Sequence, residues 1–317
     1  MKGHDGFNFA NGFRSVMLRK TKGDIHQMKP KRYAILLGLL IIASLLTACG
    51  SGERESTSDP KWDKYKNIYT ISVQNTGEDE SVAKYLEIAE RSAELFPLLE
   101  ENSNAFVMDA YNYQSIDDEG TPLYTMNGMD YPQEIDPSGQ CIRVSKNYFQ
   151  HNPIETADGS DLAEQIIYDD LTLNILVPEK YRDMEEQIID AYREDFYFEK
   201  VQATNDYNEM AGIDTVLDIP KESLNVNIIY VKDGQRYFTF RSDCAASTDN
   251  WIDDPIVKIY TSNIHCNYAH SFMTQWVYYY SDKENSESAY QDIEPYVTQC
   301  GAENSIQKVF SVYEANN

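Results

Sequence analysis

Two histidines and a cysteine fall within six residues near the carboxyl end of the chain, in the segment His265-Cys266-Asn267-Tyr268-Ala269-His270. Imidazole and thiolate groups are ligands that zinc and copper prefer, so this segment could contribute to a metal site. The spacing offers no fourth ligand, and a disulfide at Cys266 would remove the thiolate. The sequence therefore favours a loop with ordinary polar side chains, and we predict neither a bound metal nor a cofactor.

The usual motifs of enzyme active sites are absent from the sequence. No segment reads G-x-S-x-G, H-E-x-x-H, G-x-x-x-x-G-K-[ST] or G-x-G-x-x-G, the local signals of serine hydrolases, zinc proteases, P-loop proteins and dinucleotide-binding domains. Acidic pairs such as Asp169-Asp170 are explained better by solvated turns, because neighbouring side chains on a strand point to opposite faces. We therefore predict a protein without enzymatic activity.

Cys49 carries the clearest signal for a covalent modification. It follows an apolar run that begins at Tyr33, and three basic residues stand just before that run: Lys29, Lys31 and Arg32. A positive start, a short apolar core and small exit residues are typical of a secretory signal. Leu46-Thr47-Ala48-Cys49 also matches a bacterial lipobox, in which a diacylglycerol joins the Cys49 sulfur and the chain is cut after Ala48. The sequence thus predicts a leader over residues 1–48 and a lipoprotein held in the bilayer by acyl chains such as palmitate.

An uncut membrane-spanning helix is the alternative for this apolar run. Crossing a bilayer takes about 20 apolar residues, whereas a processed signal needs only about 7 to 15, so the length favours processing. In both cases the basic flank keeps the amino terminus inside and places residues from 50 onward outside. We expect the chain at the cell membrane, lipid-anchored on the extracytoplasmic face. Residues 1–27 fit a start site assigned too early, because Met28 can itself begin a complete signal.

The chain is strongly acidic, with 52 Asp and Glu residues against 27 Lys and Arg residues and a formal net charge of −25. Such a surface repels nucleic acid, and it either attracts a cationic peptide or simply keeps a tethered protein soluble. A content of 42% hydrophobic residues argues against general disorder. We predict a flexible tether over residues 49–66 and an extracytoplasmic domain over residues 67–317.

Four further cysteines follow the lipobox: Cys141, Cys244, Cys266 and Cys300. An even number of cysteines outside the cytoplasm permits disulfides, with three connectivities that spacing cannot separate. The alternative is four thiols that pack as small hydrophobic side chains.

Hydrophobic spacing predicts two units in which a strand is followed by a helix. Residues 68–73 alternate like a strand, apolar residues from Val82 to Phe96 recur at helical spacing until Pro97 ends the pattern, and residues 105–111 form the next strand. Residues 171–177 form the clearest strand. The helix after Pro178 carries an inward stripe made of Tyr181, Met184, Ile188, Tyr192 and Phe196.

Two further patterns complete the predicted fold. Residues 224–231 and 236–240 flank Asp233-Gly234, which predicts a hairpin, and residues 286–294 predict a short helix that Pro295 ends. Together the elements predict an α+β fold with a mixed sheet. Its strand–helix units leave open one domain or two similar halves, near residues 67–145 and 171–262.

Three segments resemble a known family: Asn147–Ile154, Leu173–Lys180 and Asn225–Phe240. They are similar to the extracytoplasmic portion of the bacteriocin-associated integral membrane proteins of Gram-positive bacteria. Those proteins look like relatives of the permease subunits of peptide-exporting ABC transporters and are described as immunity proteins. The resemblance covers residues 67–315 and implies a domain that contacts a transporter or a peptide in bacteriocin export or self-protection.

The sequence departs from that family in one respect. The family carries several membrane helices after the outer domain, and no second apolar run of that length follows Cys49 here. A stand-alone lipidated form and the first part of a longer membrane protein both fit this departure. The competing interpretation is a solute-binding lipoprotein of an ABC importer, which predicts two hinged lobes and a deep cleft.

Overall fold

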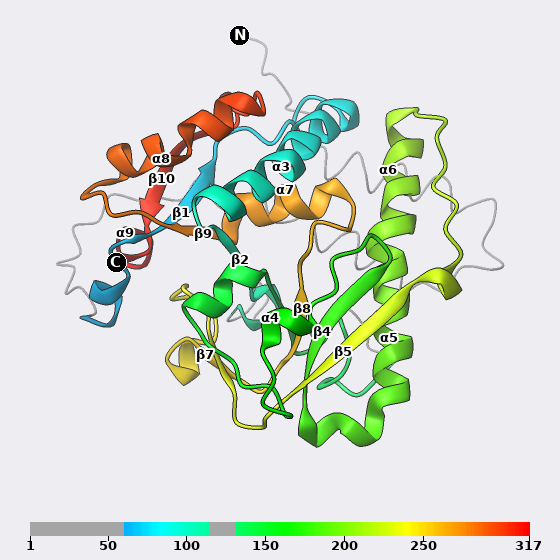
Figure 1. Cartoon of the computed structure of the whole chain (residues 1–317). Helices are drawn as coiled ribbons and strands as arrows, with labels where there is room; N and C mark the ends of the chain where they lie inside the picture. Colours follow the sequence, from blue (N-terminus) through cyan, green and yellow to red (C-terminus); the bar gives the residue numbers. More distant parts are fainter. Residues whose placement is uncertain (1–59, 115–130) are drawn as a thin grey trace, which may run out of the picture.

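The computed structural model describes residues 60–114 and 131–317 (Figure 1). The predicted leader, Cys49 with its lipobox and the first part of the predicted tether lie outside these ranges. Among the described residues, no helix has both the length and the apolar character that crossing a membrane requires.

Eight strands form one mixed sheet, in the order β10-β1-β9-β2-β3-β8-β4-β5. Two neighbouring pairs, β3 with β8 and β4 with β5, are parallel, and the other pairs are antiparallel. The predicted α+β fold with a mixed sheet is thereby confirmed. The strands are β1 (Ile68–Val73), β2 (Phe106–Asp109), β3 (Cys141–Val144), β4 (Thr172–Pro178), β5 (Asn225–Val231), β8 (Ile256–Ile259), β9 (Val277–Tyr280) and β10 (Ile306–Ser311).

Helices flank this sheet in two groups (Figure 1). α3 and α7 pack against each other near β1, and α8 packs on β10. α5, a π-helical segment (Phe198–Gln202) and α6 follow one another alongside β4 and β5. The helices are α3 (Val82–Asn102), α4 (Leu162–Gln165), α5 (Glu185–Tyr197), α6 (Ala203–Ala211), α7 (Cys266–Gln275), α8 (Ser286–Gln299) and α9 (Val312–Asn316).

The stripe predicted after Pro178 is confirmed for its last three residues, which lie on α5, whereas Tyr181 and Met184 lie in a preceding 3₁₀ helix (Glu179–Met184). Ile188, Tyr192 and Phe196 are fully buried in a core between α5 and strands β4 and β5. Tyr181 and Met184 are partly buried at the edge of the same core. Both predicted halves belong to a single sheet, because residues 67–145 contribute β1, β2 and β3, and residues 171–262 contribute β8, β4 and β5 next to them.

The prediction that Pro97 and Pro295 end helices is wrong, since both lie inside helices, α3 and α8 respectively. A proline in a helix interior removes a backbone hydrogen bond and costs about 3 kcal/mol. Leu99 and Val297 lie beyond the prolines, and both are fully buried. Burying such a side chain contributes about 1.5–3 kcal/mol, so packing of the turn beyond each proline offsets most of the local penalty.

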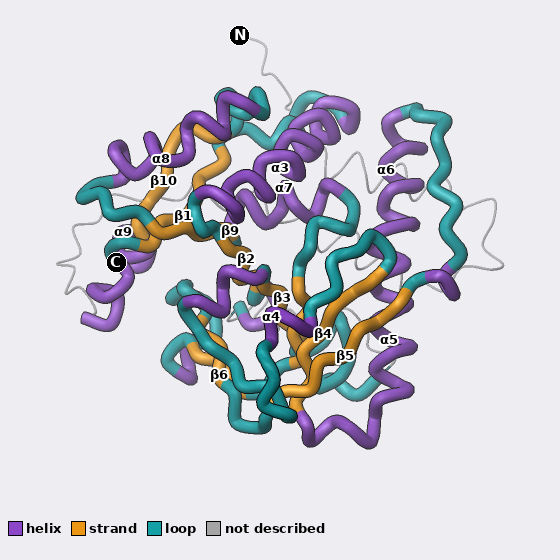
Figure 2. The backbone as a smooth tube through the Cα atoms, in the orientation of Figure 1, coloured by secondary structure: helices purple, strands orange, loops and turns teal. Residues whose placement is uncertain are grey.

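The predicted hairpin around Asp233-Gly234 is also wrong. β5 pairs along its whole length with β4, whereas β6 (Arg236–Phe238) pairs with β7 (Trp251–Asp253) in a separate small sheet (Figure 2). Gly234 does occupy a left-handed turn, at φ +83°. The predicted turn is therefore present, but the two strands that it joins pair with different strands.

The folded domain begins earlier than the predicted tether allows. Residues Pro60–Tyr65 form a 3₁₀ helix, and the Trp62 side chain is 1% exposed. The Trp62 ring packs against Phe238, with ring centroids 5.7 Å apart, and Tyr65 stacks on the same phenylalanine at 4.7 Å. Most residues of this segment are polar, which is why its composition predicts a tether. The rings of Trp62 and Tyr65 nevertheless hold it against the domain.

Candidate functional site

Two basic side chains stand in the middle of the sheet. Arg143 on β3 and Lys258 on β8 are register partners on neighbouring parallel strands, so their side chains leave the same face side by side. Both residues are almost completely buried, at 5% and 7% exposure. Buried like charges repel each other, and they are tolerated only where anions lie between them.

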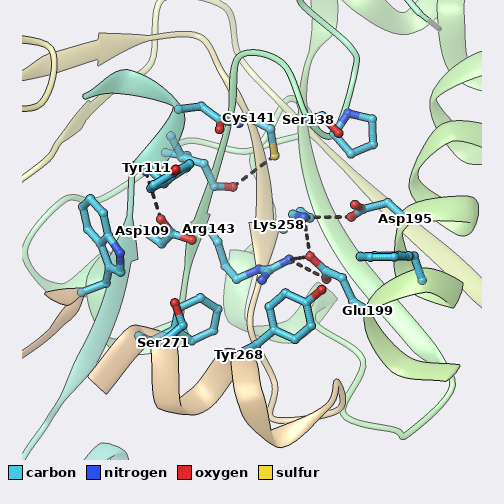
Figure 3. Close-up of a pocket in the computed structure, with 16 residues that line it drawn as sticks. Asp109, Tyr111, Ser138, Cys141, Arg143, Asp195, Glu199, Lys258, Tyr268 and Ser271 are labelled. Carbon is cyan, nitrogen blue, oxygen red and sulfur yellow. Dashed lines mark hydrogen bonds and ion pairs between the residues drawn. The ribbon is translucent and has the colours of Figure 1, made fainter. Parts of the chain in front are cut away.

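Two acidic side chains of the α5 region supply these anions (Figure 3). Glu199 accepts hydrogen bonds from Arg143 Nη2 through both carboxylate oxygens, at 2.5 and 2.6 Å, and from Lys258 Nζ at 2.9 Å. Asp195 accepts a further bond from Lys258 Nζ at 2.8 Å. We call these four residues the ion network. Its charges balance pairwise, with two cations and two anions.

Glu199 lies in the π-helical segment. A π turn is wider than an α turn and leaves a backbone carbonyl without its usual helical partner. The backbone oxygen of Glu199 instead accepts a hydrogen bond from the His265 N–H at 3.1 Å, which joins the segment to the start of α7. π turns of this kind occur frequently at functional sites.

A cavity of about 120 Å³ opens beside the ion network. All four network residues line it, together with Asp109 at the end of β2. One Asp109 oxygen accepts the backbone N–H of Tyr111 at 3.0 Å, and Asp109 forms no ion pair with any of the described residues. The aromatic part of the wall consists of Tyr111, Phe198, Tyr268, Phe272 and Trp276.

Burial and the neighbouring charges together shift the pKa values of the three carboxyl groups in different directions. Burial and the nearby charge of Glu199 raise the pKa of Asp195 to about 6. Burial also raises the pKa of Asp109, and Arg143 offsets this rise only in part. Burial acts on Glu199 too, but Arg143 and Lys258 outweigh it and hold its pKa below the ordinary value. When all three groups are ionised, the cavity wall carries three negative charges against two positive charges.

The Cys141 thiol, which lines the cavity, is not poised for nucleophilic attack. Burial raises the pKa of the Cys141 thiol to about 11, and its Sγ donates to the Ile142 carbonyl at 3.4 Å. Nucleophilic attack needs a thiolate, so this side chain stays a protonated thiol near neutral pH. Among the described residues Asp109 forms no ion pair, and a carboxylate of this kind set among aromatic rings suits a positively charged guest.

The ion network and Asp109 belong to no motif that would predict them from the sequence. Arg143 and Lys258 each interrupt a short apolar strand, within Cys-Ile-Arg-Val and Ile-Val-Lys-Ile. A charged residue inside a four-residue buried strand must have a partner, so this pattern was the available signal. It does not say which carboxylates supply the partner, because Asp109, Asp195 and Glu199 come from other elements.

The metal candidates do not converge on one point. The His265 ring stacks on Tyr207 at 4.9 Å, and its Nε2 lies 3.7 Å from the Cys266 Sγ. His270 points instead toward α3, where its Nδ1 lies 2.9 Å from the Ser92 Oγ. Within residues 60–114 and 131–317, no three His, Cys, Asp or Glu side chains are placed to hold a metal ion. The structure therefore uses these residues to join α7 to α3 and α6.

Burial of His270 predicts a loss of stability in acid. Burial lowers its pKa from 6.5 to about 4. The His270 ring therefore stays neutral in the folded protein at pH values where the same ring in the unfolded chain already binds a proton. Stability therefore falls as pH drops from about 6.5 toward 4, and this residue accounts for on the order of 2 kcal/mol between pH 7 and pH 5. His270→Gln should remove that part of the pH dependence in urea unfolding. Identical pH profiles for the two proteins would contradict the prediction.

All four cysteines that follow the lipobox are free thiols in the structure. Cys141 and Cys244 are both buried and belong to different hydrophobic cores. Cys266 lies at the start of α7, and Cys300 follows α8. The disulfide alternative is thus not realised, and the buried pair packs as small hydrophobic side chains.

The segment Asn147–Ile154, one of the three that resemble the bacteriocin-associated family, has a clear structural role. The Asn147 side chain donates to the carbonyls of Glu100 and Ala105 at 2.6 and 3.1 Å. The Tyr148 hydroxyl donates to the Phe238 carbonyl at 3.1 Å, and the Asn152 amide donates to the Arg236 carbonyl at 2.8 Å. These bonds fasten α3, the residue before β2, and β6, so the segment contributes to the fold.

Comparison with known proteins found no match. No protein-family model matches it, and no curated protein and no solved structure matches it either. The resemblance to the bacteriocin-associated family therefore stays a prediction. The candidate site is therefore supported by its geometry alone.

Proposed function

We propose that this chain is a non-enzymatic lipoprotein, anchored through Cys49 on the extracytoplasmic face of the cell membrane, whose domain engages a cationic peptide next to a membrane transporter. One observation carries the proposal. The cavity beside the ion network holds one carboxyl group, Asp109, in excess of its cations. The acidic chain around it, with a net charge of −25, attracts cations toward that cavity over longer distances.

The sequence resemblance supports the biological setting of this proposal. If the resemblance to the outer domains of bacteriocin-associated membrane proteins holds, the partner peptide belongs to bacteriocin export or immunity. An ABC transporter permease is the corresponding membrane partner. The lipobox supports the same location, because a lipid on Cys49 would keep the domain close to such a permease.

A solute-binding lipoprotein of an ABC importer is the alternative function. Such proteins close two lobes over a ligand, and the hinge lies where the chain crosses between the lobes. Here β3 and β8 pair directly along four residues, and these strands connect the two predicted halves within one sheet. This continuity favours a rigid recognition domain over a hinged one.

Peptide binding by the full chain in nanodiscs tests the proposal. A lysine-rich peptide and the same peptide with its lysines acetylated form a matched pair of ligands. We expect calorimetry to detect the charged peptide and not the acetylated one, with an affinity that falls as salt is raised, because exposed charges are screened. Equal affinity for both peptides, or binding of neither, would contradict the proposed function.

A further inference from the structure

The charge balance of the cavity singles out Asp109. Glu199 is shared by Arg143 and Lys258, and Asp195 is bonded to Lys258, so each network carboxylate already contacts a cation. Asp109 lines the same cavity from β2, on the side away from Asp195 (Figure 3). A single added positive charge would therefore complete the balance.

The position of Asp109 is held before any ligand arrives. Its carboxylate accepts the backbone N–H of Tyr111, two residues further along, which is the geometry of an Asx turn. The neighbouring residue Met108 is fully buried in the sheet, and its N–H donates to the Trp276 carbonyl at 3.0 Å. A carboxylate fixed in this way loses little conformational entropy when it binds a cation.

The aromatic wall already accommodates positive charge. The Arg143 guanidinium lies over Phe272 at 5.4 Å and over Tyr268 at 5.7 Å from the ring centroids. The Arg241 guanidinium lies over Trp276 at 4.5 Å. The faces of aromatic rings attract cations, so a wall of this kind tolerates positive charge.

The volume of the cavity limits the guest. An apolar cavity of about 150 Å³ holds one benzene ring. By that scale the present cavity, at about 120 Å³, has room for about five heavy atoms. The four methylene groups and the ammonium nitrogen of a lysine side chain match this size. A propylguanidinium group, the end of an arginine side chain, is larger.

We infer that this cavity receives a single alkylammonium group, the end of a lysine side chain, with Asp109 as its counter-ion. The inference rests on the proposed function for the source of that lysine, a cationic peptide. It adds that recognition takes place one side chain at a time, since the rest of the peptide must stay outside a cavity of this size. It also adds a preference for lysine over arginine.

Small amines test this inference separately from the peptide. We use n-butylammonium as the probe, with propylguanidinium, butyrate and glycine as comparisons, titrated into the full chain in nanodiscs at constant ionic strength. Butylammonium should bind most tightly. Asp109→Asn should weaken it about tenfold or more, as expected for loss of a charged hydrogen-bond acceptor. Asp253→Asn removes the same charge from an exposed pair with Arg236 and should leave the affinity unchanged.

A second variant keeps the test informative if Asp109→Asn unfolds. Ser271 lines the cavity from α7, and Ser271→Leu fills part of the space without changing any charge. It should abolish butylammonium binding. Tighter binding of glycine or propylguanidinium, or full affinity in both variants, overturns the inference.

The peptide and the amine give distinguishable failures. A lysine-rich peptide that binds equally well to the parent protein and to Asp109→Asn leaves the proposed function standing and overturns the inference about the cavity. Butylammonium that binds through Asp109, together with a peptide that does not bind, supports the cavity assignment and overturns the proposed function.

Discussion

Glu199→Gln should lower the free energy of unfolding by about 3–5 kcal/mol, the loss typical of a buried ion pair that is deprived of one partner. The substitution keeps the size and shape of the side chain but removes the charge shared by Arg143 and Lys258. Both cations are nearly inaccessible to water, so solvent cannot replace the carboxylate. Urea denaturation followed by circular dichroism measures the loss.

A matched control is available on α5, which leads directly into the π-helical segment. Glu194 on α5 pairs with Lys221 at 2.5 Å, but both side chains are about two-fifths exposed. Exposed pairs contribute no more than about 1 kcal/mol, so Glu194→Gln should have a small effect. A small effect of Glu199→Gln as well would show that the buried cations do not depend on this carboxylate.

Combined apolar replacement of the network should recover much of the lost stability. Replacing Arg143, Lys258, Asp195 and Glu199 together by apolar side chains removes every buried charge of the ion network at once. In other proteins such replacements are neutral or stabilising. Recovery of stability, together with loss of amine binding, would show that the network is kept for its binding site and not for its contribution to folding.

Trp62→Ala should lower the free energy of unfolding by about 3–5 kcal/mol, the usual cost of truncating a fully buried tryptophan. The indole is 1% exposed and packs on Phe238, which itself stacks with Tyr65. Removing the indole leaves a hole beside the small sheet of β6 and β7, where Phe238 also contacts Trp251 at 5.1 Å. Chemical denaturation of the full chain measures the change.

The outcome for Trp62 decides between two boundaries of the domain. The neighbouring substitution Asp63→Ala removes an exposed partner of Lys66 and should leave stability close to that of the parent protein. If Trp62→Ala behaves like Asp63→Ala, residues 60–66 belong to the tether, as their composition predicts. A large loss for Trp62→Ala alone places the start of the domain at Pro60.

Features that depend on neighbouring residues could be predicted from the sequence. The strand at residues 68–73 and the buried stripe on α5 follow from hydrophobic spacing, and the structure contains both. The left-handed turn at Gly234 follows from its Asp-Gly sequence. The α+β class follows from the same local patterns, since each of them records which face of an element must be buried.

Errors arose where a distant contact outweighed a local preference. Pro97 disfavours a helix locally, but the burial of Leu99 against the rest of the fold carries α3 past it. β6 follows a good hairpin turn, but Tyr148 and Asn152 hold its backbone beside β7 and not beside β5. Trp62 stands in a polar segment, and only its contact with Phe238 shows that the segment is folded.

By itself the sequence determined the acidic balance, the lipobox at Cys49 as a prediction, and the types of most elements, because each depends on composition or on residues close together in the chain. Only the tertiary structure decided the candidate site. Arg143, Lys258, Glu199 and Asp109 come from β3, β8, the π-helical segment and β2, and no spacing in the chain relates them. A buried charge is tolerated only beside a partner, and the partner becomes known only once the strands have found their order in the sheet.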